Sequence, residues 1–554
     1  MFSTFNRPDI LQKLQETHYD LIIIGGGITG AGIALDAASR GLKTALIEKN
    51  DFASGTSSKS TKLIHGGLRY LKQLDVALVR EVGKERAMVH SLAPHLVVSE
   101  KMLMPIIQEG TYGKWSSSAG LKVYDWLANV KKEDQRDMLS KEETIEKEPL
   151  LNESILIGSG YYAEYRTDDA RLTIEVLKTA ISKGVDCINY VCATDFIETD
   201  GKISGIHCKD LSKDEEFKMT AQFVISATGP WVDQLREKNK SLNGSRLHLT
   251  KGVHLVVAHE KFPVKQSVYF DVPDGRMIFA IPRGKTTYFG TTDTDYHEKI
   301  EDVHTNLEDA NYLLEAVNES FPSIHLTLED VESSWAGLRP LIHQEGKSAS
   351  ELSRKDEIFE AENGLISIAG GKLTGYRKMA LRIMDLVMYL KQKQDKSRFK
   401  LSKTHKIPLL ASDFKDADAV EAFTTEITTQ FIGWGLTRLD AEHVVHAYGK
   451  FTQDILVQMK DFLPNSPTPL IALIRAELFY SLHNEMVLNP LDFYIRRTGR
   501  LYFDIESVKI SLESILQDFK AYLHWNDTQY LTEKEKIEKV IHEASHFEAV
   551  TVAS

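Results

Sequence analysis

The stretch DLIIIGGGITG occupies residues 20–30 and decides the fold. An apolar run enters three glycines and is followed by AGIALDAASRG, whose composition predicts a helix that ends at Gly41. A second apolar run, KTALIEK, brings an acidic residue, Glu48, to its end. A strand, a G-x-G-x-x-G turn, a helix and a second strand closed by an acid together predict a dinucleotide-binding βαβ unit of the Rossmann type.

Each glycine of the G-x-G-x-x-G turn has a physical purpose. Gly25 allows the tight turn, Gly27 lets the backbone approach a pyrophosphate, and Gly30 lets the helix pack closely on the strand. The N–H groups at the start of the helix favour phosphate. We expect Glu48 to accept a hydrogen bond from the adenosine ribose, which disfavours a 2′-phosphate. The alternative, a glycine-rich turn in an ordinary βαβ unit, does not require this whole context.

Composition narrows the function classes. The chain has 554 residues, a net charge of -12 and only three cysteines, Cys187, Cys192 and Cys208. We therefore expect two or three domains, no nucleic acid as the main partner, and cysteines that fill space in strands without forming disulfides. No run reaches the roughly 18 apolar residues of a membrane-spanning helix, and the first residues lack a secretion signal, which together favour a reducing, cytosolic compartment.

Glycine usage divides the chain into two parts. Of the 34 glycines, 30 precede residue 401. The glycine-rich part alternates strand and helix signals, with hairpins expected at Asp200-Gly201 and within residues 276–292. The segments 419–434, 441–463 and 470–488 have helical periodicity and predict a helix bundle. The basic stretch 390–406 between the parts predicts the exposed end of a helix followed by a linker.

The segment after Glu48 favours FAD over NAD. Residues 50–71, NDFASGTSSKSTKLIHGGLRYL, are dense in serine, threonine and glycine, which supply donors along a second stretch of an extended cofactor. Only one G-x-G-x-x-G fingerprint, residues 25–30, is present, whereas enzymes that bind both FAD and NAD often have two. A flavin disulfide reductase would also need a cysteine pair near the first helix, and that region has none.

Seven motifs in order resemble the aerobic FAD-dependent glycerol-3-phosphate dehydrogenase family. They are the fingerprint, TSSKSTKLIHGGLRYL (56–71), ATGPW (227–231), KGVHLVV (251–257), GTTDTDY (290–296), AGLRPL (336–341) and GGKLTGYRKMA (370–380). The resemblance covers about residues 15–390, and the helical C-terminal part also fits. It implies oxidation of sn-glycerol 3-phosphate to dihydroxyacetone phosphate by hydride transfer from C2 to FAD N5, with electrons passed to membrane quinone.

The resemblance also implies the architecture. We expect an α/β fold (α+β overall) with a Rossmann-like FAD-binding domain of the D-amino-acid-oxidase/glutathione-reductase type, an antiparallel-sheet substrate or cap domain, and an all-helical C-terminal domain. The boundaries that we assign are 1–100, 155–245 and 330–390 for the FAD-binding domain, 101–154 and 246–329 for the cap, and 400–554 for the helical domain.

A phosphate monoester is nearly a dianion and requires cationic donors in a buried pocket. The candidates within the motifs are Arg69, Tyr70, Arg339, Arg354 and Lys372. Arg69 and Arg339 lie in otherwise apolar surroundings, whereas the assignment of Arg354 depends more on the resemblance. A surface charge or a structural ion pair is the alternative for any single arginine.

Two further expectations concern the reacting centre. Gly370 to Thr374 join an apolar strand to a helix, so we expect this helix end and Lys372 to point at the flavin N1/C2=O edge, where reduction deposits negative charge. For the hydroxyl proton, His65 and His254 are the best candidates because imidazole titrates near neutral pH. The sequence does not decide which of them is the base, or whether a water flanked by arginine accepts the proton instead, and a histidine satisfied in the core is the alternative for both.

The expected contacts to non-covalent FAD come from four segments and one isolated position. They are Gly25, Gly26, Gly27, Ile28, Thr29, Gly30, Glu48, Lys49, Thr56, Ser57, Ser58, Ser60, Lys62, Leu63, His65, Gly66, Gly67, Val191, Ala227, Thr228, Gly229, Trp231, Gly371, Lys372, Leu373 and Thr374.

A quinone acceptor would require contact with a bilayer. Residues 111–132 combine Trp115, Tyr124 and Trp126 with lysines, which suits an interfacial amphipathic segment on the inner face of the cell membrane, although an ordinary surface helix is the equal alternative. We expect no metal site, because the H-E-x-x-H string at 542–546 has only eight residues after it. The sequence leaves the oligomeric state open, and a dimer is compatible with it. The rival functions are a glycerol-3-phosphate oxidase that uses O₂ and an amino-acid or amine oxidase of the same flavin fold.

Overall fold

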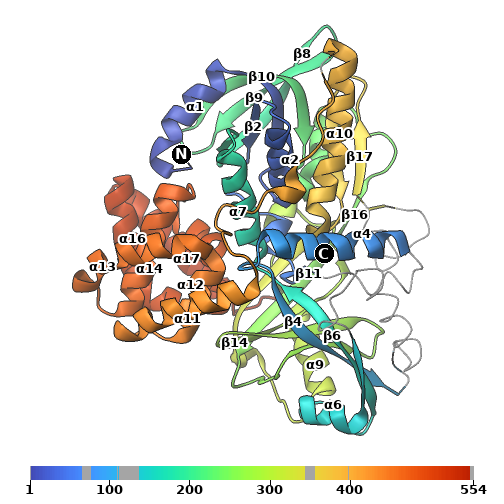
Figure 1. Ribbon diagram of the computed structural model, residues 1–554, viewed down its shortest axis with the longest axis vertical. Coiled ribbons are helices and arrows are strands. Elements are labelled where there is room, and N and C mark those ends of the chain that lie inside the picture. The colour runs from blue at the N-terminus through green and yellow to red at the C-terminus, as the bar shows by residue number, and fades with distance from the viewer. Residues whose placement is uncertain are drawn as a thin grey trace.

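The computed structural model describes residues 2–64, 76–108, 110, 136–343, 356–396 and 398–549. Within these residues the chain forms two large sheets and a group of C-terminal helices, which lies to one side of the first sheet (Figure 1). The predicted combination of a Rossmann-like unit, an antiparallel sheet and a helical C-terminal part is confirmed.

The first sheet is built around the fingerprint. Its order is β17 (Asp356–Glu360), β18 (Ile366–Gly370), β10 (Glu215–Ser226), β1 (His18–Ile24), β2 (Thr44–Ile47) and β7 (Asp186–Ile188), with β9 (Lys202–Asp210) and β8 (Val191–Thr199) joined to β10. The strands from β18 to β7 run parallel, which explains why β1 is a continuous apolar run. Strands β8 and β9 form the hairpin predicted at Asp200-Gly201.

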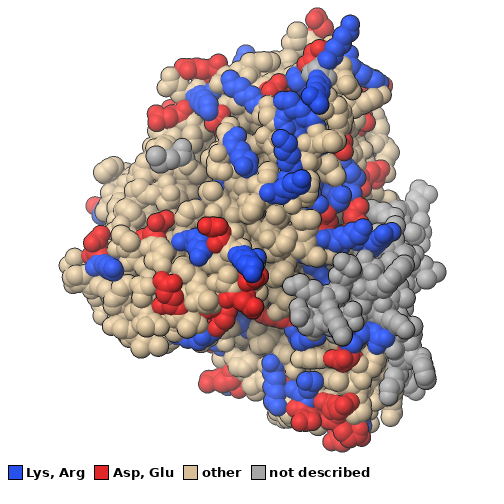
Figure 2. Space-filling model, viewed as in Figure 1, with Lys and Arg blue, Asp and Glu red and all other residues tan. Residues whose placement is uncertain are grey.

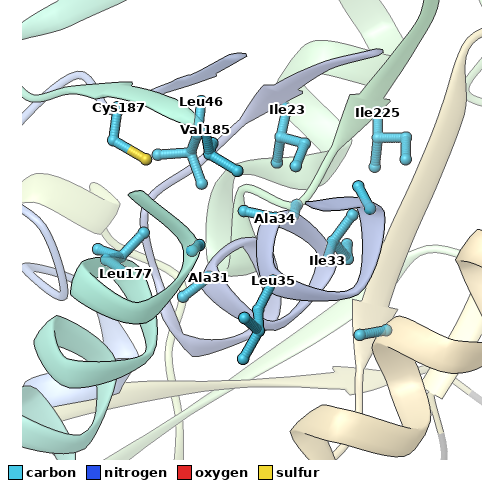
Figure 3. Close-up of a cluster of buried hydrophobic side chains, with 14 of the residues drawn as sticks. Ile23, Ala31, Ile33, Ala34, Leu35, Leu46, Leu177, Val185, Cys187 and Ile225 are labelled. Atoms are coloured by element: carbon cyan, nitrogen blue, oxygen red, sulfur yellow. The ribbon is translucent and has the colours of Figure 1, made fainter. Parts of the chain in front are cut away.

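Helices cover this sheet and bury its core. They include α1 (Arg7–Glu16), α2 (Ile28–Ser39), α4 (Val76–Leu92), α7 (Asp169–Ile181), α8 (Val232–Lys238) and α10 (Tyr376–Asp395). Small residues let α2 lie close to its neighbours: Ala31 and Ala34 pack beneath Ile23 of β1 and Leu46 of β2, and Leu177 of α7 closes the side (Figure 3). Because α2 is held this tightly, its first turn is fixed relative to the strand ends.

The second sheet is mostly antiparallel. Its order is β15 (Thr294–Asp295), β11 (Leu247–Ala258), β14 (Thr286–Gly290), β13 (Met277–Arg283), β12 (Ser267–Asp271), β4 (Val98–Ile107), β6 (Leu156–Arg166) and β3 (Leu63–Ile64), with β16 (Val331–Ile342) beside β11 and β5 (Asp137–Ser140) beside β6. Helices α6 (Lys141–Lys147) and α9 (Leu307–Ser320) accompany it. The predicted pair within 276–292 is β13 with β14. Strands β6 and β16 fall in ranges that we assigned to the FAD-binding domain, yet they pair in this sheet, and the division into domains stays a prediction.

The C-terminal part is helical, as its periodicity predicted. It comprises α11 (Ala417–Gly433), α12 (Arg438–Tyr448), α13 (Thr452–Phe462), α14 (Pro469–Asn484), a π-helical turn (Asp492–Arg497), α15 (Arg500–Phe503), α16 (Ile505–Leu523) and α17 (Asp527–Glu543). Helix α10 ends at Asp395, and an exposed basic connection follows it, as expected. Figure 2 shows lysine and arginine side chains gathered over α10 on this face.

Candidate functional site

A cavity of about 440 Å³ opens at the carboxyl ends of β1, β2, β10 and β18. It continues onto β11 and β16 of the second sheet, so both sheets contribute to one space. Its volume lies in the range of small-molecule and cofactor sites, and its position is the crevice where parallel sheets of this kind bind ligands. The candidate site is therefore this cavity.

The glycine cradle, residues 25–30, forms one wall of the cavity. Gly25 has a φ of +114°, and a Cβ there would lie 2.5 Å from the Ala227 carbonyl oxygen. A Cβ on Gly30 would lie 1.9 Å from the Gly25 carbonyl oxygen, so strand and helix meet without room for a side chain. A Cβ on Gly27 would fall 3.0 Å from Ser57 Oγ, inside the space that a ligand would use. The cradle fits the backbone approach that a pyrophosphate requires.

The first turn of α2 meets polar side chains from the next segment. The Ile28 N–H donates to Ser57 Oγ at 2.9 Å. Glu48 lines the cavity, and its carboxylate accepts the Gly26 N–H at 2.7 Å and the Asn50 N–H at 2.9 Å. Burial raises the pKa of Glu48 above its usual value. Each carboxylate oxygen has a further lone pair, so Glu48 both fixes the turn and fits the ribose contact expected of it.

In the polar segment after Glu48, some side chains line the cavity and others are buried behind it. The Thr56 hydroxyl donates to the Leu338 carbonyl at 2.7 Å, and Ser60 donates to Asp169 at the start of α7. The Lys62 ammonium lies 2.5 Å from Asp169. Ser58 and Lys62, two expected cofactor contacts, are buried outside the cavity lining. Lys62 holds the segment through Asp169 and the Ser58 carbonyl, whereas Thr56, Ser57 and Ser60 reach the cavity.

Most of the remaining predicted cofactor contacts line this cavity. They are Gly25, Gly27, Ile28, Thr29, Glu48, Lys49, Thr56, Ser57, Ser60, Leu63, Val191, Ala227, Thr228, Gly229, Trp231, Gly371, Lys372, Leu373 and Thr374. Gly26 and Gly30 lie behind the wall. Several predicted positions fall outside the described residues, namely His65, Gly66, Gly67, Arg69, Tyr70, Arg354 and the segment 111–132.

Cationic side chains occupy the cavity near the second sheet. Arg339 of β16 donates from Nη1 to Asp293 Oδ1 at 2.8 Å and from Nη2 to Thr291 Oγ1 at 2.8 Å. Lys372 lies at the N-terminal end of the 3₁₀ turn Leu373–Gly375, which leads from β18 into α10. The predicted strand-to-helix connection at 370–374 is thus present, and the structure brings Arg339 and Lys372 to the same cavity.

His254 projects from β11 into the cavity lining and is only 1% exposed. Its ring stacks on Trp335 at 4.8 Å between centroids, and Nε2 lies 3.0 Å from Thr61 Oγ1. Burial, reinforced by the charges of Arg339 and Lys62, lowers the pKa of His254 well below its usual value. The imidazole is therefore neutral, and one ring nitrogen has a lone pair that can accept a proton.

Two features of the cavity were missed by the sequence analysis. Lys59 lines the cavity, and burial together with the charge of Arg496 lowers its pKa to about 8. At the cavity edge, Lys49 lies 4.3 Å over the Trp231 ring, and the Trp231 indole N–H donates to Glu301 at 2.6 Å. Lys59 was within a quoted motif, but nothing in the motif distinguished it from Lys62. Glu301 was not in any motif.

Comparison with known proteins identifies the family. Residues 20–377 match the family described as FAD dependent oxidoreductase, and residues 402–530 match the C-terminal domain of alpha-glycerophosphate oxidase. The aerobic glycerol-3-phosphate dehydrogenase of Bacillus subtilis is 48% identical over 98% of both chains, and that of Staphylococcus haemolyticus is 47% identical over the same shares. The chain belongs to the aerobic glycerol-3-phosphate dehydrogenase family.

Membership of this family confirms the resemblance and makes the protein an FAD-dependent enzyme. The crystal structure of a Bacillus halodurans glycerol-3-phosphate dehydrogenase complexed with FAD is 41% identical, with a TM-score of 0.84 and 99% of each chain covered. The glycine cradle, Glu48 and the hydroxyls of Thr56 and Ser57 fit the adenine dinucleotide part of such a cofactor.

No described helix has the length and apolar character needed to cross a bilayer. No cluster of three or more His, Cys, Asp or Glu side chains in the described parts of the chain is placed to hold a metal ion.

Proposed function

We propose that the protein oxidises sn-glycerol 3-phosphate to dihydroxyacetone phosphate in this cavity. The supporting observation is that a single cavity joins the glycine cradle to Arg339, Lys372 and His254. The wall that would hold an adenine dinucleotide and the cations that would hold a phosphate ester therefore share one space. The names of the relatives agree with this substrate.

Arg339 and Lys372 bind the substrate phosphate in this proposal. Charge-assisted hydrogen bonds to a phosphate dianion are the strong ones, and they gain further in a cavity that excludes water. Asp293 orients the Arg339 guanidinium through its 2.8 Å contact. When bound, FAD supplies atom N5 as the acceptor of the hydride from substrate C2. The protein's contribution is to hold that carbon in place and to manage the hydroxyl proton.

His254 is the candidate for accepting that proton. It is neutral, it lines the cavity, and its ring is fixed by Trp335 and Thr61. The lowered pKa keeps the imidazole unprotonated and able to take the proton as the alcohol becomes a ketone, at the cost of a lower basicity than that of an ordinary histidine. His65 stays the second candidate on sequence grounds. Replacing each histidine by asparagine and comparing the pH dependence of flavin reduction would assign the base.

Anaerobic titration of the holoenzyme tests the substrate. Addition of glycerol 3-phosphate should bleach the flavin absorbance, whereas glycerol and glycine at the same concentration should leave it unchanged. Glycerol lacks the phosphate, and glycine tests the amino-acid oxidase alternative. Bleaching by glycine, or equal bleaching by glycerol, would contradict the proposed function.

Membrane quinone is the proposed electron acceptor, with peripheral attachment of the protein to the inner face of the cell membrane. The segment 111–132 is the proposed contact, argued from its aromatic and lysine residues. Flotation with anionic vesicles should capture the wild type and should lose a Trp115→Ser/Trp126→Ser variant. The match of the C-terminal part to an alpha-glycerophosphate oxidase domain makes O₂ the second candidate acceptor. Peroxide formed in proportion to substrate consumed, with no quinone reduction, would favour the oxidase.

A further inference from the structure

The C-terminal helices reach the cofactor site through one buried cluster, which we call the Asp51 brace and define as Asp51, Arg496 and Arg497. Arg496 Nε lies 2.5 Å from Asp51 Oδ2. Arg497 grips both oxygens, with Nη1 2.8 Å from Oδ2 and Nη2 3.0 Å from Oδ1. Asn189 Nδ2 also donates to Oδ1 at 3.0 Å. Both arginines belong to the π-helical turn Asp492–Arg497, more than 440 positions along the chain from Asp51.

Asp51 stands at the start of the loop that walls the cavity. Its carbonyl accepts the Ser54 N–H at 3.2 Å, and residues 54–57, 59 and 60 then line the cavity. The loop also contacts the cradle near its start, where the Ala53 N–H donates to the Gly26 carbonyl at 3.0 Å. A displacement of Asp51 would therefore move both the loop and the backbone of the glycine cradle.

In the Asp51 brace, the buried carboxylate and the two guanidiniums each compensate the charge of the other. Asp51 is 1% exposed and both arginine side chains are at most 11% exposed. Burial by itself would raise the pKa of Asp51, but the two guanidiniums outweigh it and lower this pKa to about 2. Removing one partner of such a cluster leaves a buried charge without compensation. Asp51 would then move toward water or toward another donor.

Arg496 also acts on the cavity directly. Its charge is one cause of the lowered pKa of Lys59, which lines the cavity. Arg496 is further held by Asp492, with Nη2 2.7 Å from Oδ1, and Asp492 accepts the Tyr190 hydroxyl at 2.6 Å. The arginine is thus fixed on the side away from the loop as well as on the side that faces it.

We propose that Arg496 and Arg497 are positioning residues for FAD: from the C-terminal helices they fix Asp51 and, through it, keep loop 51–61 in the conformation that retains the cofactor. This gives the C-terminal helical part a function in cofactor retention. The proposal concerns FAD and not the substrate, so it stands or falls independently of the function proposed above.

The test measures FAD release from the holoenzyme by the rise in flavin fluorescence after dilution, together with the melting temperature of each variant. Arg496→Met should release FAD about tenfold faster than wild type. A tenfold change corresponds to about the free energy of one hydrogen bond to a charged group, which is the contact that the loop loses in this variant. Arg496→Lys should restore part of the retention, because an ammonium can still reach one Asp51 oxygen.

The matched control is Arg475→Met. Arg475 also makes a two-point contact with an aspartate, Asp518, at 2.7 Å and 2.7 Å, but both residues lie within the C-terminal helices and away from the loop. This variant should lower the melting temperature and leave FAD release unchanged. If Arg496→Met fails to fold, Asp51→Asn replaces it and should show the same faster release. Release within twofold of wild type in the folded brace variant, or equal acceleration in Arg475→Met, would overturn the proposal.

Discussion

Two walls of one cavity are built in different ways. The glycine cradle, residues 25–30, is shaped by local backbone contacts between β1 and α2, and its closest approach is between Gly30 and the Gly25 carbonyl. The second wall, loop 51–61 with β16, is held by charged side chains from other parts of the chain: Asp51 by Arg496, Ser60 by Asp169, and Arg339 by Asp293. The cradle has no room for a side chain at Gly25 or Gly30. The conformation of loop 51–61 and the orientation of Arg339 depend instead on hydrogen bonds and ion pairs from other segments.

The largest effect is expected in the cradle. Gly30→Ala places a Cβ 1.9 Å from the Gly25 carbonyl oxygen, a backbone atom that cannot move aside without shifting β1. We expect a folded protein, if obtained, to purify without flavin, since overpacking costs about 1–3 kcal/mol or more and distorts the turn itself. The bound flavin per chain, measured by absorbance, checks this.

Gly375→Ala is the control, because Gly375 directly precedes α10 beside the cavity and a Cβ there meets nothing within 4 Å. Full flavin content in Gly30→Ala would show that the cradle is not a close-contact wall.

Within the second wall, Arg339 is expected to affect catalysis and not FAD binding. Arg339→Met removes the cation that Asp293 orients. We expect the rate of flavin reduction by glycerol 3-phosphate in rapid mixing to fall about 100-fold, the scale of one or two charged hydrogen bonds, while flavin content is retained. Arg276→Met, which removes a half-buried guanidinium paired with Asp274 outside the cavity lining, should reduce at the wild-type rate. An unchanged rate in Arg339→Met would remove Arg339 from the phosphate site.

A smaller, pH-dependent effect is expected from Lys59. Burial and Arg496 lower its pKa to about 8, so above this pH the side chain of the flavin-free protein is increasingly neutral. Anionic FAD favours the charged lysine, so binding takes up a proton in this range and weakens as pH rises through 8. The dissociation constant of FAD should rise by at most about tenfold per pH unit above 8. Lys59→Met should bind FAD more weakly at pH 7 and lose this dependence, and a pH dependence that survives the substitution would assign it to another group.

The smallest effect is expected at the edge of the cavity. Glu301 accepts the Trp231 indole N–H at 2.6 Å and pairs with Lys49 at 3.1 Å, but its side chain is 53% exposed. Exposed ion pairs contribute little, about 0.2–1 kcal/mol. Glu301→Gln should therefore change FAD release by no more than about two- to fivefold, measured as for the brace variants. A larger change would mean that this edge contact, and not the Asp51 brace, retains the cofactor.

The two walls also differ in how far the sequence predicts them. The position of the cradle and its close backbone contacts were predicted correctly. Strand, turn and helix are adjacent in the chain, so the spacing of the glycines indicates where their backbones touch. The hairpins β8–β9 and β13–β14 were predictable for the same reason. In the second wall, the sequence did not show which lysine of SKSTK faces the cavity. Lys59 does, whereas Lys62 is turned away by Asp169, a partner 107 positions along the chain.

The C-terminal helices illustrate the same limit. Their periodicity predicted helices, since that signal is local, but gave no sign that Arg496 and Arg497 would meet Asp51. Both arginines read as ordinary charges in FYIRRTGR, and Asp51 as an ordinary turn residue. Only the tertiary structure shows that the three form a buried cluster beside the cavity.

The central claim is that one cavity holds FAD on the glycine cradle and a phosphate ester against Arg339 and Lys372. Its most direct test is a crystal structure of the holoenzyme with dihydroxyacetone phosphate. We predict that the cofactor pyrophosphate lies over Gly27 and that the ligand phosphate lies within hydrogen-bonding distance of the Arg339 guanidinium and the Lys372 ammonium. A ligand phosphate bound elsewhere, with Arg339 still engaged only by Asp293 and its neighbours, would contradict the account.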